Sequence, residues 1–295
     1  MSLKHSFEMQ TKPQRVVVVG SNGFVGASVM GRLAAAGIDA LGISRKDIDL
    51  LADDAADQLM AALRPSDCVV LAAAIAPCKN AAMMLDNMIL LRNLITSLSQ
   101  VRPDHVINIS SDAVFPDEPV PLSEATPLAP GSMHGAMHLT REIAFRSEVY
   151  APLAIVRPTL LYGVRDPHNG YGPNRFRRCA NQGQPIVLFG DGEERRDHVL
   201  IDDLAEVILR IILHRSIGAL NVATGAVHSF FEIAQMVVAA AHANVEIKKT
   251  PRVGEMPHKG YRSFDVSACR AAFSDLPFAA LQDGLVAVQS QETRD

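Results

Sequence analysis

Short apolar runs alternate with longer amphipathic segments through the first half of the chain. Residues 15–19 read RVVVV, a run of β-branched side chains that is typical of a strand buried on both faces of a parallel sheet. Similar patterns predict strands at 40–44, 68–74, 106–110 and 153–157 and helices at 27–36, 52–63, 83–98 and 135–149. This regular alternation predicts a doubly wound parallel α/β sheet of Rossmann type, with helices on both faces.

The pattern changes after about residue 162. A stretch rich in glycine and proline, 163–173, precedes a mixed region with a strand expected at 185–189 and a helix at 202–213. We therefore expect a flexible leader at 1–13, a dinucleotide-binding domain at 14–163 and a smaller C-terminal α+β substrate lobe at 164–295. Parts near 196–222 are candidates for packing back on the first domain. Substrate is expected between the lobes, at the carboxyl ends of the strands.

Composition excludes several classes of function. The 295 residues carry a formal charge of −4 and a pI near 6.2, which favours neither nucleic-acid nor anionic-membrane partners. No apolar run approaches the roughly 18 residues of a membrane span, and the polar first residues lack the apolar stretch of a signal peptide. The four cysteines are scattered and the histidines show no ligand spacing, so we expect reduced thiols, no metal and a cytoplasmic location.

A glycine-rich turn lies between the first strand and the first helix. The segment 20–26 reads GSNGFVG, so its glycines suit a tight turn, close approach of a pyrophosphate, and close packing of helix on strand. The residues expected to contact a dinucleotide here are Gly20, Asn22, Gly23, Phe24, Val25 and Gly26. The alternative is a glycine-rich turn that binds no ligand.

The end of the second expected strand bears on the choice between NAD and NADP. An acidic residue commonly holds the adenosine ribose at this place, whereas this chain has Ser44, Arg45 and Lys46. Two cations beside a hydroxyl suit a 2′-phosphate, so we prefer NADP over NAD, the alternative being that both cations are solvated loop charges. Asp49 is a candidate to accept a hydrogen bond from the adenine amino group, with Leu50 beside it in the same site.

Several motifs resemble the extended short-chain dehydrogenase/reductase family, in its NAD-dependent epimerase/dehydratase group that acts on nucleotide sugars. The likeness runs from Val16 to about Val286 and includes GSNGFVG, DCVVLAAA at 67–74, SSDAVF at 110–115 and RPTLLYG at 157–163. It continues with GDG at 190–192, RDH at 196–198 and DDLA at 202–205. The resemblance implies further cofactor contacts from Ala72, Ala73, Ala74, Asn87, Ser110 and His138, and a homodimer formed through the helices at 83–98 and 135–149.

The catalytic pair of that family is replaced in this chain. The family has a tyrosine acid/base and, four residues later, a lysine that holds the nicotinamide ribose and lowers the tyrosine pKa. The matching positions here are His134 and His138. A histidine has an ordinary pKa of about 6.5 and can exchange protons near neutrality without such help, although His138 is a poorer permanent cation than lysine. Ser111 is expected to orient the substrate oxygen, and the resemblance makes Asp112 a second candidate acid.

Arginines in the second lobe suit a substrate diphosphate, because a guanidinium binds phosphate oxygens in bidentate fashion. The resemblance favours Arg196, and Arg175 and Arg262 are further candidates; the alternative for the run around 175–178 is a solvated helix face. Leu160 stands where the family often has a substrate-binding asparagine. Two hypotheses follow: an NAD(P)-linked oxidoreductase or epimerase of a nucleotide sugar or related carbonyl compound, or a non-catalytic dinucleotide-binding protein such as a redox sensor.

Overall fold

The computed structural model describes residues 2–118 and 120–292, so Met1, Pro119 and 293–295 lie outside it. A six-stranded, all-parallel sheet forms its centre, with the strand order β2-β1-β3-β4-β5-β9. The strands are β1 (Arg15–Val19), β2 (Ala40–Ile43), β3 (Asp67–Leu71), β4 (His105–Ile109), β5 (Leu153–Pro158) and β9 (Gly218–Val222). The doubly wound parallel sheet predicted from the sequence is confirmed.

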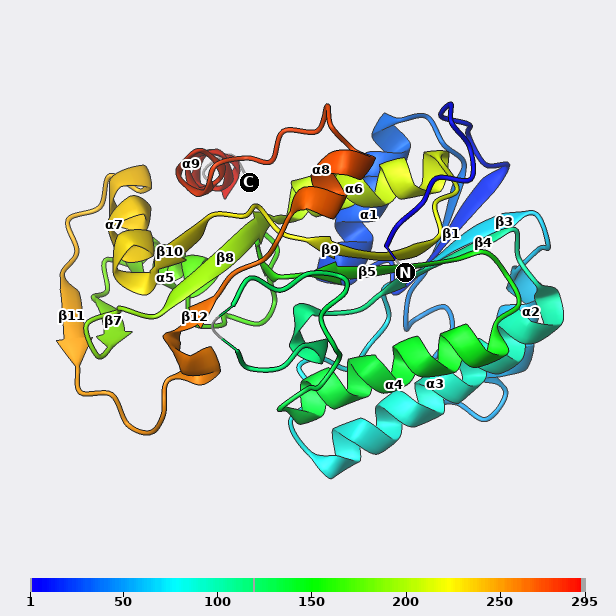
Figure 1. Ribbon diagram of the computed structural model, residues 1–295, viewed down its shortest axis with the longest axis horizontal. Helices are drawn as coiled ribbons and strands as arrows, with labels where there is room; N and C mark the ends of the chain where they lie inside the picture. The colour runs from blue at the N-terminus through cyan, green and yellow to red at the C-terminus, as the bar shows by residue number, and fades with distance from the viewer. Residues whose placement is uncertain (1, 119, 293–295) are drawn as a thin grey trace.

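Helices cover both faces of this sheet (Figure 1). On one face lie α1 (Phe24–Ala35), α6 (Ile201–Leu213) and α8 (Ser267–Ala272), and on the other lie α2 (Ala55–Ala62), α3 (Ala81–Val101) and α4 (Met133–Glu148). The central strands β3 and β4 are buried along their whole length, as expected for inner strands of a parallel sheet that helices cover on both faces. The chain passes from β1 to β2 on one side and then crosses to β3 on the other side of β1, which creates the switch point where such sheets bind ligands.

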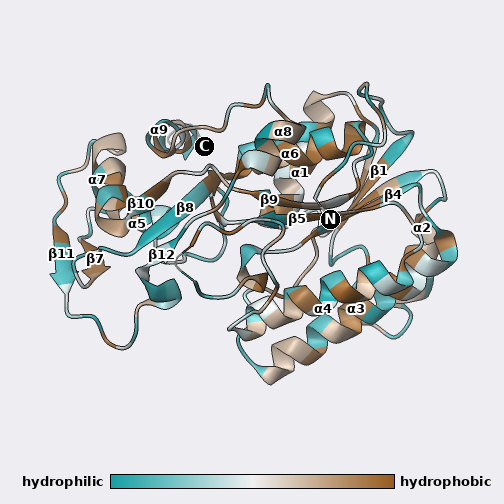
Figure 2. Ribbon diagram, in the orientation of Figure 1, coloured by the Kyte–Doolittle hydropathy of each residue, from teal (hydrophilic) through white to brown (hydrophobic). Residues whose placement is uncertain are grey.

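The second lobe is smaller and of mixed type. It contains β6 (Leu160–Tyr162), α5 (Pro173–Asn181), β7 (Ile186–Phe189), β8 (Arg195–Leu200), β10 (Val227–Ser229), α7 (Phe230–Ala240), β11 (Ile247–Thr250), β12 (Tyr261–Arg262) and α9 (Leu281–Glu292). Strand β8 pairs with β6, β10 and β12, and β7 pairs with β11. Short 3₁₀ turns, η1 (Asp112–Val114) and η2 (Pro257–Gly260), lie in the two lobes. Figure 2 colours β8 as hydrophilic, yet its Arg196, Asp197 and His198 are buried.

Three elements that follow Gly163 in the chain, α6, β9 and α8, belong to the core of the first lobe. Strand β9 extends the central sheet beside β5, and α6 packs against α1. The short helix α8 also contributes Cys269 to this core. The first lobe is therefore discontinuous in sequence, and the chain returns to it twice after the change of pattern near residue 162.

The first residues of the chain are docked on the first lobe, in contrast to the loose leader that we expected. Lys4 exchanges two backbone hydrogen bonds of 2.8 Å with Ile217, beside β9. The ring of His5 stacks on His214 at 4.3 Å, and the Thr11 N–H donates to the Leu213 carbonyl. The unpaired edge of β9 and the end of α6 offer free backbone groups, which explains why a polar segment is held there.

Within the described residues, no helix is both long and apolar enough to cross a membrane. The same residues contain no cluster of three or more His, Cys, Asp or Glu side chains that would hold a metal ion.

Candidate active site

A cleft of about 300 Å³ opens at the switch point, between the carboxyl ends of β1, β2 and β3. Ten of the residues that the sequence predicted for cofactor binding line it together: Gly20, Asn22, Gly23, Ser44, Arg45, Asp49, Leu50, Ala72, Ala73 and Ala74. Sequence reasoning missed the apolar wall formed by Val19, Ile43, Ile48, Leu51, Ile75 and Leu90. Most of these apolar residues could have been predicted from their place in the sequence, because they lie next to the predicted residues at the ends of the three strands.

The glycine turn has a geometry that only glycines allow. Gly20 has a φ of +91°, and a Cβ built there would lie 2.6 Å from the Ala73 backbone nitrogen. A Cβ on Gly26 would lie 2.1 Å from the Gly20 carbonyl oxygen, so α1 packs directly on the turn. Gly23 is the N-cap of α1 and offers no capping side chain, which leaves the first N–H groups of the helix for a ligand. These observations fit a dinucleotide pyrophosphate at the start of α1.

The adenosine end of the cleft carries a mixed set of charges. The Ser44 hydroxyl and N–H both donate hydrogen bonds to the Asp47 carboxylate, over 2.7 and 2.8 Å. These bonds lower the pKa of Asp47. Arg45 is exposed and pairs loosely with Asp49 at 3.3 Å. An exposed guanidinium with such a weak partner can turn to a phosphate at little cost.

Six predicted cofactor residues do not line this cleft. Phe24 and Val25 pack on the first core, and Gly26 is covered by the turn. Asn87 is buried, and its amide bonds to both backbone groups of Ile75 at 3.0 Å, so it fixes the loop after β3. The remaining two, Ser110 and His138, are buried near α4.

Ser110 belongs to a buried polar network. Its hydroxyl donates to Glu142 at 2.6 Å, and Arg157 binds the same carboxylate through two bonds of 2.7 and 2.8 Å. Both ions of this pair are at most 2% exposed. The network ties α4 to β5 and to Ser110, which directly follows β4.

The predicted catalytic groups meet where η1 packs against the start of α4. A Cβ on Gly135 would lie 2.0 Å from the Ala113 carbonyl oxygen, so glycine is required for this approach. The approach brings His134 near enough to Asp112 for the carboxylate charge to act on the imidazole. Ser111 caps η1 by accepting a hydrogen bond of 3.1 Å from the Ala113 N–H. The structure thus gathers Ser111, Asp112 and His134 at one edge of the sheet.

The two histidines are in edge-to-face contact, with ring centroids 4.7 Å apart. Burial lowers the pKa of His134, and the charge of Asp112 opposes this effect only in part. The pKa of His138 lies well below its ordinary value because of burial and the nearby His134 and Arg141. Both rings are therefore neutral at pH 7, and His138 does not replace the lysine as a cation.

A backbone contact selects the tautomer of His134. The Cys78 N–H donates to its Nδ1 across 3.4 Å. Since Nδ1 accepts this bond, the proton of the neutral ring lies on Nε2. The resting imidazole thus offers an N–H donor to a substrate oxygen.

Two of the three predicted substrate arginines are buried and paired. Arg262 donates to Asp112 at 2.8 Å and is 2% exposed, so the expected phosphate binder and the expected acid hold each other. Arg196 pairs with Glu194 and donates to the Pro257 carbonyl at 2.7 Å. Arg175 is exposed on α5. A substrate diphosphate would therefore have to compete with carboxylates for Arg196 and Arg262.

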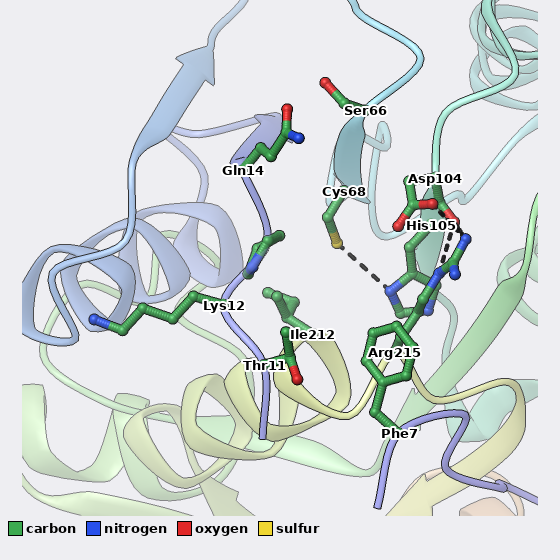
Figure 3. A pocket seen from close by; sticks show the side chains of 11 residues that line it. Phe7, Thr11, Lys12, Gln14, Ser66, Cys68, Asp104, His105, Ile212 and Arg215 are labelled. Carbon is green, nitrogen blue, oxygen red and sulfur yellow. Dashed lines mark hydrogen bonds and ion pairs between the residues drawn. The ribbon is translucent and has the colours of Figure 1, made fainter. Parts of the chain in front are cut away.

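A second cavity, of about 270 Å³, lies at the opposite edge of the sheet, beside the amino ends of β1, β3 and β4. Figure 3 shows Cys68 and His105 at its base, with Sγ and Nδ1 3.5 Å apart. His105 Nε2 lies 2.8 Å from the Ser216 carbonyl oxygen, and burial lowers the pKa of His105 to about 4. Burial also raises the pKa of the Cys68 thiol, so the pair is a neutral hydrogen bond far from the predicted catalytic groups.

The model of the NAD dependent epimerase/dehydratase family matches residues 16–223. A UDP-glucose 4-epimerase of Mycolicibacterium smegmatis is 28% identical over 172 residues, which are 57% of this chain and 53% of the epimerase. UDP-glucuronic acid decarboxylase 4 of Arabidopsis thaliana is 26% identical over 40% of this chain and 28% of the decarboxylase. The chain thus spans about half or less of the curated relatives it matches.

Solved structures resemble the fold over nearly its whole length. The UDP-glucose 4-epimerase of Thermus thermophilus in complex with NAD has a TM-score of 0.81 at 20% identity, over 95% of this chain and 99% of that one. A GDP-L-fucose synthetase of Naegleria fowleri bound to NADP also has a TM-score of 0.81, at 18% identity, over 100% and 97%. At these identities the likeness establishes the fold alone.

Proposed function

The chain belongs to the NAD-dependent epimerase/dehydratase family, and from this premise we propose that it is an NADP-linked oxidoreductase or epimerase of a nucleotide-activated sugar or related carbonyl compound. His134 is the group that exchanges a proton with the substrate oxygen. The observation that carries the proposal is the meeting of Ser111, Asp112 and His134 at the same sheet edge as the dinucleotide cleft.

The cleft supports a dinucleotide on physical grounds. The turn leaves no room for Cβ atoms at Gly20 and Gly26, and the start of α1 presents uncapped N–H groups to a diphosphate. Arg45 supports NADP over NAD, because it is an exposed cation that lines the cleft at the end of β2 and has only a loose partner. A bound nicotinamide ring supplies the acceptance and return of hydride.

Proton transfer follows from the state of His134. The resting ring donates its Nε2–H in a hydrogen bond to a substrate carbonyl oxygen, and so polarises the carbonyl, as neutral imidazoles do elsewhere. Full transfer of a proton to the oxygen requires the ring to take up a proton from solvent first, because loss of the Nε2 proton from the neutral ring would leave an imidazolate. Removal of a hydroxyl proton requires the other tautomer, with the lone pair on Nε2. That tautomer loses the Cys78 hydrogen bond, at a cost of about 1 kcal/mol. The geometry therefore favours substrates that enter as carbonyls.

The substrate class rests on arginines of the second lobe: Arg175 is exposed, and a diphosphate would take Arg196 and Arg262 from their carboxylate partners. Relatives are named as enzymes of UDP-glucose and UDP-glucuronic acid, which supports a nucleotide sugar. We further propose a homodimer through α3 and α4, since these helices lie side by side on one face of the first lobe (Figure 1).

Parallel fluorescence titrations with NADPH and NADH test the cofactor proposal. We expect tighter binding of NADPH, and tighter binding of NADH would reject the role of Arg45. A screen of nucleotide sugars and their keto forms then tests the reaction, with His134→Ala as the comparison. Undiminished turnover in that variant would reject His134 as the proton-exchanging group.

A non-catalytic dinucleotide-binding role is favoured by one observation. His138 is buried and neutral, so the position of the family lysine carries no charge. A protein of this kind would bind NADPH but transfer no hydride to any substrate in the screen.

A further inference from the structure

Helix α4 carries a buried cation that the proposed mechanism does not use. The Arg141 side chain is fully buried. Its Nη1 donates to the Ala73 carbonyl at 3.0 Å, its Nη2 donates to the Asn108 amide oxygen at 3.2 Å, and its guanidinium lies 5.6 Å from the centre of the Phe145 ring. Nε is buried and has no hydrogen-bond partner among the described residues.

No carboxylate in the described part of the chain neutralises this charge. Each of the other arginines that are at most 5% exposed, Arg157, Arg177, Arg196 and Arg262, has a carboxylate partner within 4 Å. Glu142, the next residue along the chain, is already held by Arg157 and Arg146. Burial alone lowers the pKa of Arg141, to about 10, so the guanidinium remains charged at neutral pH. An unpaired buried charge is destabilising unless another group compensates it.

The place of Arg141 indicates which anion compensates it. Ala73 lines the dinucleotide cleft, and its backbone is pressed against Gly20 of the pyrophosphate-binding turn. The Ala73 carbonyl accepts the bond from Arg141. One peptide segment therefore separates the buried cation from the predicted diphosphate site. The same charge also acts on His138 one turn earlier on α4.

We propose that Arg141 is a positioning residue for the dinucleotide, which holds the Ala73 wall of the cleft and supplies the fixed positive charge missing from position 138. The inference rests on the proposed function, because it requires a dinucleotide in the cleft. The anionic cofactor and the buried guanidinium stabilise each other through the Ala73 segment, so apo protein bears a cost that cofactor binding relieves. Arg141 thus acts on binding without reacting itself.

The test is an NADPH titration of the full chain with four variants. Arg141→Met and Arg141→Gln remove the charge, and Gln keeps a donor for the Ala73 carbonyl. Arg141→Lys keeps the charge, and Arg92→Met removes an exposed arginine from the neighbouring helix α3. Melting temperatures are measured with and without NADPH. We expect the dissociation constant to rise at least about tenfold in both neutral variants, to recover largely in Arg141→Lys and to stay unchanged in Arg92→Met.

Stability separates this proposal from a purely structural role. Replacing an unpaired buried charge by Met leaves the apo melting temperature unchanged or raises it, and reduces the increase that NADPH causes. Wild-type affinity in both neutral variants would overturn the proposal, and so would an Arg141→Lys protein that binds as weakly as Arg141→Gln. Failure of the wild type to bind either dinucleotide would instead reject the proposed function.

Discussion

The stability of this protein at acid pH is expected to depend on His198, a buried histidine in β8. His198 is 4% exposed and lies against Phe230, with ring centroids 6.1 Å apart. Neither ring nitrogen meets a partner in hydrogen-bond geometry within the described residues. Burial lowers the pKa of His198 to about 3, the charge of Arg196 adds to this, and only the Arg196 backbone favours the protonated ring.

The sign and size of the effect follow from proton binding. Below an unfolded pKa of about 6.5 the unfolded chain takes up a proton that folded His198 refuses, so the free energy of unfolding falls as the pH falls. With a folded pKa of about 3, the loss attributable to His198 between pH 8 and pH 5 is about 2 kcal/mol.

The variant His198→Leu removes the titrating group and keeps a similar volume. Urea unfolding of wild type and variant at pH 8 and pH 5 gives the difference in free energy of unfolding at each pH. We expect that difference to shift by about 2 kcal/mol in favour of the variant at pH 5. Contributions from His105 and His138 are common to both proteins and cancel. A difference that is the same at both pH values would refute the reasoning.

Three further predictions concern the candidate site. Gly26→Ala places a Cβ 2.1 Å from the Gly20 carbonyl oxygen, so we expect it to lose about 1–3 kcal/mol of stability and to weaken NADPH binding, whereas Gly31→Ala, with open space at its Cβ, does neither; urea unfolding and titration measure both. Arg45→Ala should weaken NADPH binding by about 10–100-fold and leave NADH binding unchanged, and equal loss for both would exclude a 2′-phosphate contact. His134→Ala should lower turnover by about 10²–10⁴-fold at constant NADPH affinity, as steady-state kinetics and titration would show.

The sequence predicted the central sheet well because its signal is local. Strand β1 carries four consecutive valines after Arg15, and the glycine turn occurs directly between this strand and a helix. The elements β9 and α6 lie in the stretch near 196–222 that was a candidate for packing back on the first domain, whereas α8 was expected in the second lobe, since nothing in its own residues shows that it returns to the first. The placement of these elements depends on pairing and packing over more than sixty residues of chain.

Side-chain partners were harder to predict than elements. Arg262 and Asp112 were each read as groups for a ligand, but they lie 150 residues apart in sequence and pair with each other. The burial of Arg141 was not predicted, because an arginine on a helix is usually solvated. Its burial becomes evident only when α4 is packed on the sheet. Residue type thus indicated chemistry, and the fold determined which of these groups stay available.

The Asp112–Arg262 pair also has a mechanical meaning. Asp112 belongs to η1 of the first lobe, and Arg262 belongs to β12 of the second, so their ion pair is a latch between the lobes. An anion that binds Arg262 has to break its ion pair with Asp112, and the cost of breaking it reduces the binding free energy of that anion. By reciprocity, any change that separates the lobes makes Arg262 available to anions. If Arg262 binds substrate as proposed, ligand affinity is therefore coupled to the spacing of the lobes.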